Sequence, residues 1–346
     1  MTTVAVTGPT GDLGRALLHR LEHRPEVRRV IGMARSPFNP GAEGLTKTEY
    51  LRGDILDRTS VEELVARADV VVHLAFAIFG KSEETEKINV EGSRIVFEAT
   101  VGSSARRLVY ASSVAAYGWH EENPQVLTEE IPARGFESHY YSRQKAEVER
   151  LLQEMTRGQG LDVYVFRPCI VAGPRALTLI EKIPYVQLGE RLPGPVKRLA
   201  GAIPLLRPVV PDPGIAFQLV HEDDVAAAFE LAILGEGEPG TYNLAAEGDI
   251  TIADIANALG WYSIPIPELA VDTTAKIVSR LPLLPSETKW LQALKVPVLM
   301  DCTKARTKLG WEPRYDVLDT LAETIYGARE KGLLPWRLVA PQKSEL

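Results

Sequence analysis

The sequence predicts an α/β protein in which a doubly wound parallel sheet is accompanied by a smaller, mostly helical C-terminal lobe. Three observations lead to this prediction. Short, apolar, β-branched runs alternate with amphipathic stretches through the first half of the chain, which is the pattern of βαβ units. A glycine-rich turn joins the first apolar run to the first amphipathic stretch. Beyond residue 170 the sequence becomes irregular and rich in proline.

The individual elements follow from hydrophobic periodicity. Predominantly apolar segments predict strands at residues 4–7, 27–34, 68–75, 108–112 and 163–167, and residues 49–52 are predicted to form a further short strand. Apolar residues at helical spacing predict a first helix that starts near Leu13, and further helices at residues 61–66, 88–100 and 141–155. We therefore expect residues 1–170 to form the sheet domain.

The second half predicts both a return to this domain and a separate lobe. Segments within about residues 215–245 are expected to return to the sheet domain, with a strand at 217–221 and a helix at 222–234. Residues 171–214 and 246–332 are expected to form the second lobe, and 333–346 a tail. A strand at 241–244 and helices near 253–259, 289–294 and 318–329 are also assigned to this lobe.

Composition excludes several function classes. The formal net charge is -7, and no concentrated basic face is present to bind nucleic acid. The two cysteines, Cys169 and Cys302, are far apart and have no metal-ligand spacing, which indicates a reducing compartment and no metal site. The longest apolar run, residues 70–79, is about half the length of a membrane span. With no signal-peptide pattern after Met1, we expect a cytoplasmic protein with no nucleic-acid or membrane partner.

The glycine-rich turn has the features of a phosphate-binding loop. It reads Thr7-Gly8-Pro9-Thr10-Gly11-Asp12-Leu13-Gly14, directly between the first strand and the first helix. Glycines at these positions let the backbone approach a pyrophosphate, whose charge is stabilised by amide groups and the helix dipole. The turn therefore predicts a Rossmann-type dinucleotide-binding domain, with cofactor contacts at Gly8, Thr10, Gly11, Asp12, Leu13 and Gly14.

The end of the second strand bears on the choice of cofactor. It reads Gly32-Met33-Ala34-Arg35-Ser36, where a carboxylate would contact the ribose 2′-hydroxyl of NAD. Because Arg35 favours a 2′-phosphate instead, NADP(H) is predicted, with NAD left open if Arg35 is only a solvated strand end. Asp54 and Ile55 follow the third strand and are predicted to contact adenine, although Asp54 is equally well read as a loop residue.

Tyr141 and Lys145 are predicted to be catalytic. Their spacing places both on one face of a helix, and a nearby ammonium would lower the pKa of the phenol, which makes it a usable acid or base. Ser113 ends the strand at 108–112, about thirty residues earlier, and its hydroxyl is predicted to hold a substrate oxygen against Tyr141. The Tyr–Lys spacing alone also occurs by chance, and a serine at a strand end also serves as a cap.

Together these motifs resemble the extended short-chain dehydrogenase/reductases of the NAD(P)-dependent epimerase/dehydratase type, over nearly the whole chain. Further shared motifs are Gly53-Asp54, Val72-His73-Leu74-Ala75, Asn89-Val90-Glu91-Gly92, Arg167-Pro168, Val220-His221-Glu222-Asp223-Asp224 and Leu309-Gly310-Trp311. The resemblance implies Tyr141 as acid/base, Lys145 as its electrostatic partner and a ligand of the nicotinamide ribose, and Ser113 as the oxygen-holding residue. It also implies that Leu74, Ala75, Phe76, Asn89 and Pro168 line the cofactor, that 171–214 and 246–332 bind substrate, and that the helices at 88–100 and 141–155 pair in a homodimer.

The sequence departs from the family pattern at positions that handle nucleotide sugars. Members acting on them typically carry arginines that clamp the diphosphate, but residues 214–220 and 291–297 contain none. Dehydratases typically carry an Asp-Glu pair after the catalytic hydroxyl, where this chain has Val114-Ala115. Candidate pocket residues are apolar: Phe76, Ile78, Phe79, Trp119, Tyr185 and Leu188.

Three functions are consistent with these features. The first is an NAD(P)-dependent oxidoreductase that transfers hydride between NADP(H) and a fairly apolar small-molecule ketone or alcohol. The second is a nucleotide-sugar epimerase with tightly held NAD. The third is a regulatory protein that senses the dinucleotide without turnover.

Overall fold

The computed structural model describes residues 1–183, 185–187, 208–266 and 298–334. The chain divides into two compact units. The first holds Met1–Cys169, Glu222–Ala245 and Met300–Arg314. The second holds the described residues of 170–221, 246–299 and 315–346.

A parallel sheet of seven strands forms the centre of the first unit, which confirms the predicted fold class. The strand order is β11-β7-β5-β4-β1-β2-β3. Their bounds are β1 (Thr2–Thr7), β2 (Val27–Ala34), β3 (Thr48–Arg52), β4 (Val70–His73), β5 (Arg107–Ala111), β7 (Asp162–Pro168) and β11 (Gly240–Leu244). The chain leaves β1 toward β2 on one side and resumes at β4 on the other, so the topological switch point lies between β1 and β4.

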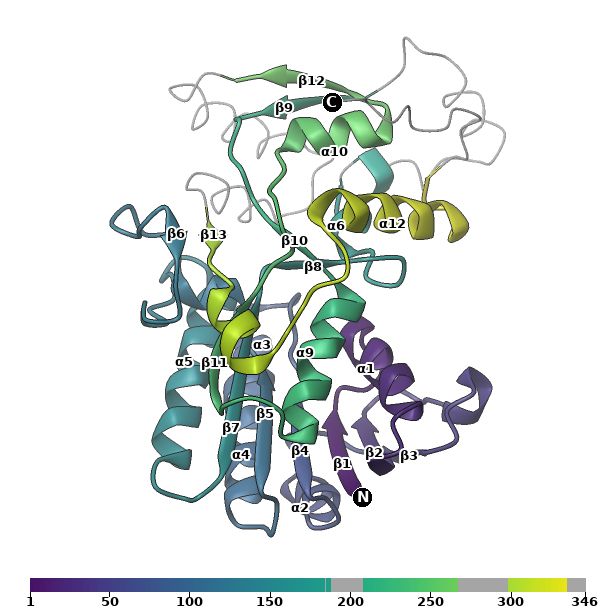
Figure 1. The fold of residues 1–346 in the computed structure, drawn as a ribbon, viewed down its shortest axis with the longest axis vertical. Coiled ribbons are helices and arrows are strands. Elements are labelled where there is room, and N and C mark those ends of the chain that lie inside the picture. The colour runs from purple at the N-terminus through teal and green to yellow at the C-terminus, as the bar shows by residue number, and fades with distance from the viewer. Residues whose placement is uncertain (184, 188–207, 267–297, 335–346) are drawn as a thin grey trace. The chain divides into compact units, whose positions relative to one another are not determined.

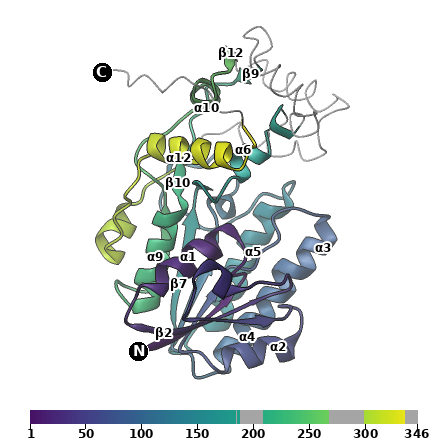
Figure 2. The same cartoon turned by 90° about the vertical axis from the view of Figure 1, so that its right-hand side faces the viewer.

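Helices cover both faces of this sheet (Figures 1 and 2). α1 (Asp12–Glu22) and α9 (Glu222–Leu234) pack together on one face. α2 (Arg58–Val65), α4 (Gly92–Val101) and α5 (Tyr140–Thr156) pack side by side on the other. The apolar stripes of α2, α4 and α5 bury side chains such as Leu64, Phe97 and Leu152 in one core with Val71 and Leu108 of the strands. Burial of this apolar surface fixes the helices on the sheet.

Shorter elements complete the first unit. α3 (Ser82–Glu86) and a π-helical turn at Lys87–Glu91 lead into α4, so the helix predicted from residue 88 begins with an irregular turn. Two 3₁₀ turns lie at Pro40–Glu43 and Val114–Tyr117. β6 (Val126–Leu127) precedes α5, and β13 (Leu299–Met300) leads to a π-helical turn at Ala305–Leu309.

The second unit combines two small sheets with three helices among its described residues. β8 (Ile170–Ala172) pairs with β10 (Leu219–His221), and β9 (Val209–Asp212) pairs with β12 (Tyr262–Pro265), both in parallel. The helices are α6 (Thr178–Glu181), α10 (Ile252–Leu259) and α12 (Val317–Glu330). Their inward faces share a core that includes Ile180, Ile255 and Leu321.

Two strand predictions were wrong. The strand expected to return to the main sheet at 217–221 is β10, whose backbone pairs with β8 in a separate sheet. The strand assigned to the second lobe at 241–244 is β11, which forms the edge of the main sheet against β7, with Tyr242 opposite Phe166. The helix predicted near 289–294 lies outside the described residues, as does the tail from 335 onward.

The register of the sheet brings three strand ends to one edge. Thr7 of β1 lies opposite His73 of β4, and His73 lies opposite Tyr110 of β5. The loops that follow these strands therefore leave the sheet from the same edge. In a doubly wound sheet, ligands bind at the carboxyl ends of the strands near the switch point. The three loops are the glycine loop, residues 74–77, and residues 112–113.

Candidate active site

The glycine loop is held tightly against the rest of the first unit. Gly8 has a φ of +75°, and a Cβ there would lie 2.8 Å from the backbone nitrogen of Ala75. A Cβ on Gly14 would overlap the carbonyl oxygen of Gly8. Both positions require glycine because the loop packs closely against the segment after β4 and against the start of α1.

Gly11 differs from the other two glycines. It precedes α1 as the N-cap residue, is exposed, and has an ordinary φ of -75°. A Cβ at Gly11 would meet only the carbonyl oxygen of Gly8, at 3.7 Å. The chain therefore leaves space beside the Cα of Gly11, at the positive end of the α1 dipole. A phosphate group binds favourably at such a helix end, so the loop fits a phosphate-bearing cofactor. Thr10, Asp12 and Leu13 lie on the same turn.

The loop after β2 carries Arg35 on its surface. The Tyr50 hydroxyl donates hydrogen bonds to the carbonyl oxygens of Ala34 and Ser36, the first at 2.7 Å, which fixes the backbone on both sides of Arg35. Arg35 itself is exposed. The guanidinium is thus carried by an anchored turn at the end of β2, where a 2′-phosphate is recognised in this class of domain.

The two predicted adenine contacts have structural roles. The Asp54 carboxylate accepts a hydrogen bond from the backbone nitrogen of Leu56 at 3.0 Å, which closes a turn. Ile55 is buried, and a Cβ on Gly92 of α4 would meet its Cδ1 at 2.6 Å. Contact of either residue with a cofactor stays a prediction. Pro168 is buried at the end of β7, and its cofactor contact is likewise untested.

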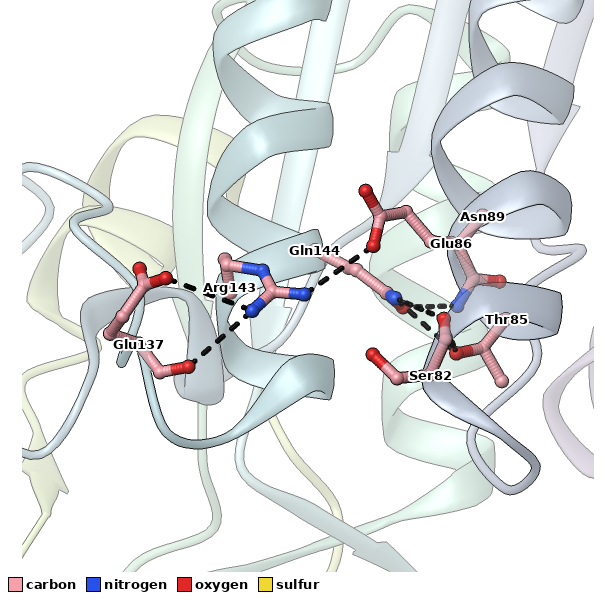
Figure 3. A network of polar contacts seen from close by, with 7 residues as sticks. All are labelled: Ser82, Thr85, Glu86, Asn89, Glu137, Arg143 and Gln144. Carbon is pink, nitrogen blue, oxygen red and sulfur yellow. Dashed lines mark hydrogen bonds and ion pairs between the residues drawn. The ribbon is translucent and has the colours of Figure 1, made fainter.

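Asn89 ties the segment after β4 to helix α5 (Figure 3). Its Oδ1 accepts from the backbone nitrogen of Ala77 at 2.7 Å, and its Nδ2 donates to the Ala77 carbonyl at 2.9 Å. The same Nδ2 donates to Gln144 Oε1 at 2.9 Å. Gln144 Nε2 in turn donates to the Ser82 carbonyl and to Thr85 Oγ1 at 3.4 and 3.3 Å. Both amides are fully buried. Asn89 thus positions the loop that holds Leu74, Ala75 and Phe76, while a direct contact with cofactor stays a prediction.

Two more contacts reinforce this attachment. The Tyr140 hydroxyl donates to the carbonyl oxygen of Ile78 at 2.8 Å. Arg143 forms ion pairs with Glu86 at 3.4 Å and Glu137 at 3.8 Å (Figure 3). The first turn of α5 is therefore joined to residues 77–89 at several points. Sequence reasoning missed Gln144 and Arg143, because a polar residue within a catalytic motif gives no signal of what it contacts.

Ser113, Tyr141 and Lys145 come together at the carboxyl edge of the sheet. Ser113 is the N-cap of the 3₁₀ turn after β5, and its Oγ accepts from the backbone nitrogen of Ala115 at 3.2 Å. The Ser113 side chain lies close enough to the Tyr141 phenol to lower its pKa. The Lys145 Nζ lies 5.8 Å from the centre of the Tyr141 ring and donates to the carbonyl oxygen of Ala111 at 2.7 Å.

The expected lowering of the Tyr141 pKa was wrong for the chain without a bound cofactor. Burial raises the pKa of Tyr141 above its usual 10.0, and the Ser113 side chain only partly offsets this. Burial also lowers the pKa of Lys145 to about 7, although the carboxylate of Glu149 acts in the opposite direction. The Lys145 ammonium donates to Ala111 and does not contact the phenol, so desolvation outweighs its effect on Tyr141.

A buried ion pair between α5 and β7 lies close to Lys145. The Glu149 carboxylate binds the Arg167 guanidinium through Nε at 2.9 Å and Nη2 at 2.5 Å, and it accepts the hydroxyl of Ser112. Arg167 also donates to the Ile131 carbonyl and packs on the ring of Tyr117. Glu149 therefore joins α5 to the ends of β5 and β7. Sequence reasoning did not find it, although it falls one helical turn after Lys145.

His73 is a structural residue at the same edge. The Thr7 hydroxyl lies 2.7 Å from Nδ1, and the Ser93 hydroxyl lies 2.8 Å from Nε2. Burial lowers the pKa of His73 to about 3, so the ring is neutral. Because Ser93 Oγ donates to the Asn89 carbonyl and Thr7 Oγ1 accepts from Ala75, the consistent tautomer donates from Nε2 to Ser93.

The family model described as the NAD dependent epimerase/dehydratase family matches residues 4–245. The chain belongs to this family. The predicted resemblance is confirmed, and membership supports an enzyme that uses a nicotinamide dinucleotide and a small-molecule substrate.

Similar proteins agree with membership of the epimerase/dehydratase family. An uncharacterized protein of Mycobacterium tuberculosis is 26% identical over 343 residues, covering 96% of this chain and 85% of the relative. The dTDP-glucose 4,6-dehydratase of Streptomyces antibioticus is 26% identical over 346 residues, covering 92% and 90%. The solved dTDP-glucose 4,6-dehydratase of Streptomyces venezuelae, with NAD bound, has a TM-score of 0.72 at 19% identity, covering 96% of this chain and 99% of that chain. At that identity the likeness shows the fold.

Metal clusters, membrane-spanning helices and the candidate pocket residues can be assessed for the described part of the chain. There, no cluster of three His, Cys, Asp or Glu residues is arranged to hold a metal ion. In the same ranges, no helix has both the length and the apolarity that crossing a membrane requires. Of the pocket candidates, Ile78 and Phe79 are exposed in the first unit, Tyr185 is exposed in the second, and Leu188 lies outside the described residues.

Proposed function

We propose that this member of the epimerase/dehydratase family is an NADP(H)-dependent reductase or dehydrogenase of a fairly apolar ketone or alcohol. The observation that carries the proposal is the convergence of Tyr141, Ser113 and a buried lysine at the sheet edge that also bears the glycine loop. The bound nicotinamide would supply or accept the hydride. Gly8, Thr10, Gly11, Asp12, Leu13 and Gly14 would hold its pyrophosphate.

The side chains divide the remaining chemistry. Because the Ser113 and Tyr141 hydroxyls are neighbours, both can bond to one substrate oxygen, so that Ser113 holds this oxygen while Tyr141 donates or accepts the proton. A phenol with a raised pKa is fully protonated near neutrality, which suits it to donate a proton to a carbonyl oxygen during reduction. The Lys145 ammonium, 5.8 Å from the centre of the phenol ring, would stabilise the phenolate that remains by its charge, without direct contact.

The surroundings of Tyr141 favour an apolar substrate. Phe76 packs edge-to-face on Tyr141 with ring centres 5.5 Å apart, and His139 lies on another side at 6.4 Å. Ile78 and Phe79 are exposed nearby in the sequence. The turn that begins at Ser113 continues with Val114 and Ala115, which offer no carboxylate for loss of water.

The cofactor preference and assembly are part of the same proposal. Arg35 at the end of β2, with no carboxylate beside it, supports NADP over NAD. We also propose a homodimer through α4 and α5, a cytoplasmic location, and a substrate-binding role for the second unit.

One experiment tests the function and its runner-up together. The purified protein is denatured, and any released nucleotide is identified. A separate native sample of the protein is assayed for oxidation of added NADPH with a panel of aryl and alkyl ketones. We expect little retained nucleotide and turnover of an apolar ketone, with NADPH preferred over NADH and the preference reduced in Arg35→Glu. Retained NAD and interconversion of UDP-glucose and UDP-galactose would refute it.

The second candidate is a nucleotide-sugar epimerase. It is favoured by the similarity to a solved UDP-glucose 4-epimerase of Thermotoga maritima, with a TM-score of 0.69, 20% identity and coverage of 95% of this chain and 99% of that chain. The absence of arginine from residues 214–220 opposes it, because a guanidinium is the preferred diphosphate ligand. A dinucleotide sensor without turnover is the third candidate, and the complete Ser-Tyr-Lys set opposes it.

A further inference from the structure

The Lys145 ammonium is buried with few polar partners. Lys145 is only 3% exposed, and among the described residues its recorded hydrogen bond goes to the Ala111 carbonyl. No carboxylate of those residues forms an ion pair with it. An ammonium has three donors and is costly to bury without compensation. The Glu149 carboxylate favours this charge without forming an ion pair, so a group in direct contact with the ammonium would add to its stabilisation.

The ring of Phe76 lies where this compensation is needed. Lys145 Nζ is 3.6 Å from the centre of the Phe76 ring, which is well within the range of a cation–π interaction. The same ring packs edge-to-face on Tyr141. One aromatic side chain therefore contacts both members of the Tyr-Lys pair, with its face toward the ammonium and its plane perpendicular to the phenol ring.

The backbone next to Phe76 is anchored to the helix that carries this pair. The N–H of the neighbouring Ala77 donates to Asn89, and the Ala77 carbonyl accepts from Asn89. Asn89 also donates to Gln144 of α5 (Figure 3). The next residue, Ile78, accepts the hydroxyl of Tyr140. The loop and α5 therefore move together, and the position of the Phe76 ring relative to Lys145 is fixed.

We propose that Phe76 is a positioning residue, which holds the Lys145 ammonium over its ring face and packs perpendicular to the Tyr141 ring. The inference rests on the proposed function for the roles of Tyr141 and Lys145. The contacts of the phenyl ring are independent of any substrate. Other titratable groups that face Lys145 are Glu149 and Tyr141 of α5, Tyr110 of β5, whose ring centre is 5.1 Å from Nζ, and His73 of β4.

The test compares Phe76→Leu with Phe76→Tyr. Leucine keeps an apolar side chain without an aromatic face, and tyrosine keeps the ring. Protein labelled with ¹³C at the lysine Cε is titrated by NMR without nucleotide, and the Lys145 signal is assigned by its loss in Lys145→Met. The wild-type pKa is expected at about 7. A cation–π contact of about 1–2 kcal/mol predicts that Phe76→Leu lowers it by roughly one unit, while Phe76→Tyr leaves it in place.

An unchanged or raised pKa in Phe76→Leu would overturn the inference, because loss of a desolvating side chain alone raises a lysine pKa. If Phe76→Leu does not fold, as judged by circular dichroism, Phe76→Met serves the same purpose with the same expected shift. The titration involves no substrate. A shift of the expected sign in a protein that reduces no ketone would leave the role of Phe76 intact and refute the proposed function.

Discussion

Neutralising Glu149 is expected to destabilise the first unit strongly. Glu149 and Arg167 have side chains that are 1% and 3% exposed, and each carboxylate oxygen binds one nitrogen of the guanidinium. In Glu149→Gln the amide keeps the shape of the carboxylate and loses its charge. The Arg167 cation then remains buried with the Ile131 carbonyl and the face of Tyr117 as its remaining partners among those recorded.

The size of the effect follows from these contacts. Breaking a buried pair by removing one charge costs about 3–5 kcal/mol, and hydrogen bonds to charged groups contribute about 1.5–3 kcal/mol each. Because glutamine retains one acceptor oxygen, we expect a loss near the lower limit, about 3 kcal/mol. For a chain of 346 residues the entropy of unfolding is about 0.7 kcal/mol/K, so that loss lowers the melting temperature by roughly 4 °C.

Differential scanning calorimetry measures this change. The matched control is the double variant Glu149→Leu with Arg167→Met, which removes both charges and is expected to recover most of the loss. Should Glu149→Gln unfold within about 0.5 kcal/mol of the wild type, the range of ordinary surface substitutions, the ion pair would not have the structural role assigned to it.

Three further outcomes are expected. Gly11→Ala should weaken NADPH binding at least about tenfold by calorimetric titration, while the nucleotide-free protein loses at most about 1 kcal/mol from the poorer N-cap; equal affinity would contradict the phosphate loop. Ser113→Ala should lower kcat about a hundredfold with little change in NADPH affinity, and an unchanged kcat would remove Ser113 from the site. The folded-state pKa of His73 is depressed from 6.5 to about 3. The contribution of His73 to stability is therefore complete above pH 6.5 and is lost as the pH falls toward 3, by about 1.4 kcal/mol per pH unit. Urea unfolding of the wild type and of His73→Gln should show different slopes of unfolding free energy against pH between pH 3 and 6.5, and equal slopes would refute this account of His73.

The main sheet could be predicted because its strands are buried on both faces. Such strands read as continuous apolar runs, as at Val70, Val71 and Val72 of β4, a strand in which every residue is buried. The glycine loop could be predicted because two of its glycines are required by backbone packing of the chain itself. The spacing of Tyr141 and Lys145 was informative because four residues return to the same face of a helix.

The sheet to which a short strand belongs could not be predicted. β10 (Leu219–His221) and β11 (Gly240–Leu244) are both short, and their partners are β8 and β7. Pairing is decided by contacts distant in sequence, which a local pattern does not encode. The same limit applies to Asn89 and Gln144, whose amides meet from different helical segments.

The direction of the Tyr141 pKa shift also could not be predicted from the sequence. Spacing indicates that a cation is near, but it does not report how deeply the phenol is buried or where the ammonium points. In the structure, Lys145 donates to Ala111 and lies over Phe76. Desolvation therefore determines the sign for Tyr141.

Hydride transfer in Tyr141→Phe tests the central claim most directly. NADPH oxidation by wild type and variant is followed in single-turnover experiments with a ketone that the wild type reduces, and NADPH affinity is measured separately. We expect the rate to fall by about 10²–10⁴-fold, with NADPH affinity within about twofold of the wild type because the ring itself is retained. A variant that transfers hydride at the wild-type rate would show that the Tyr141 phenol does not move the proton.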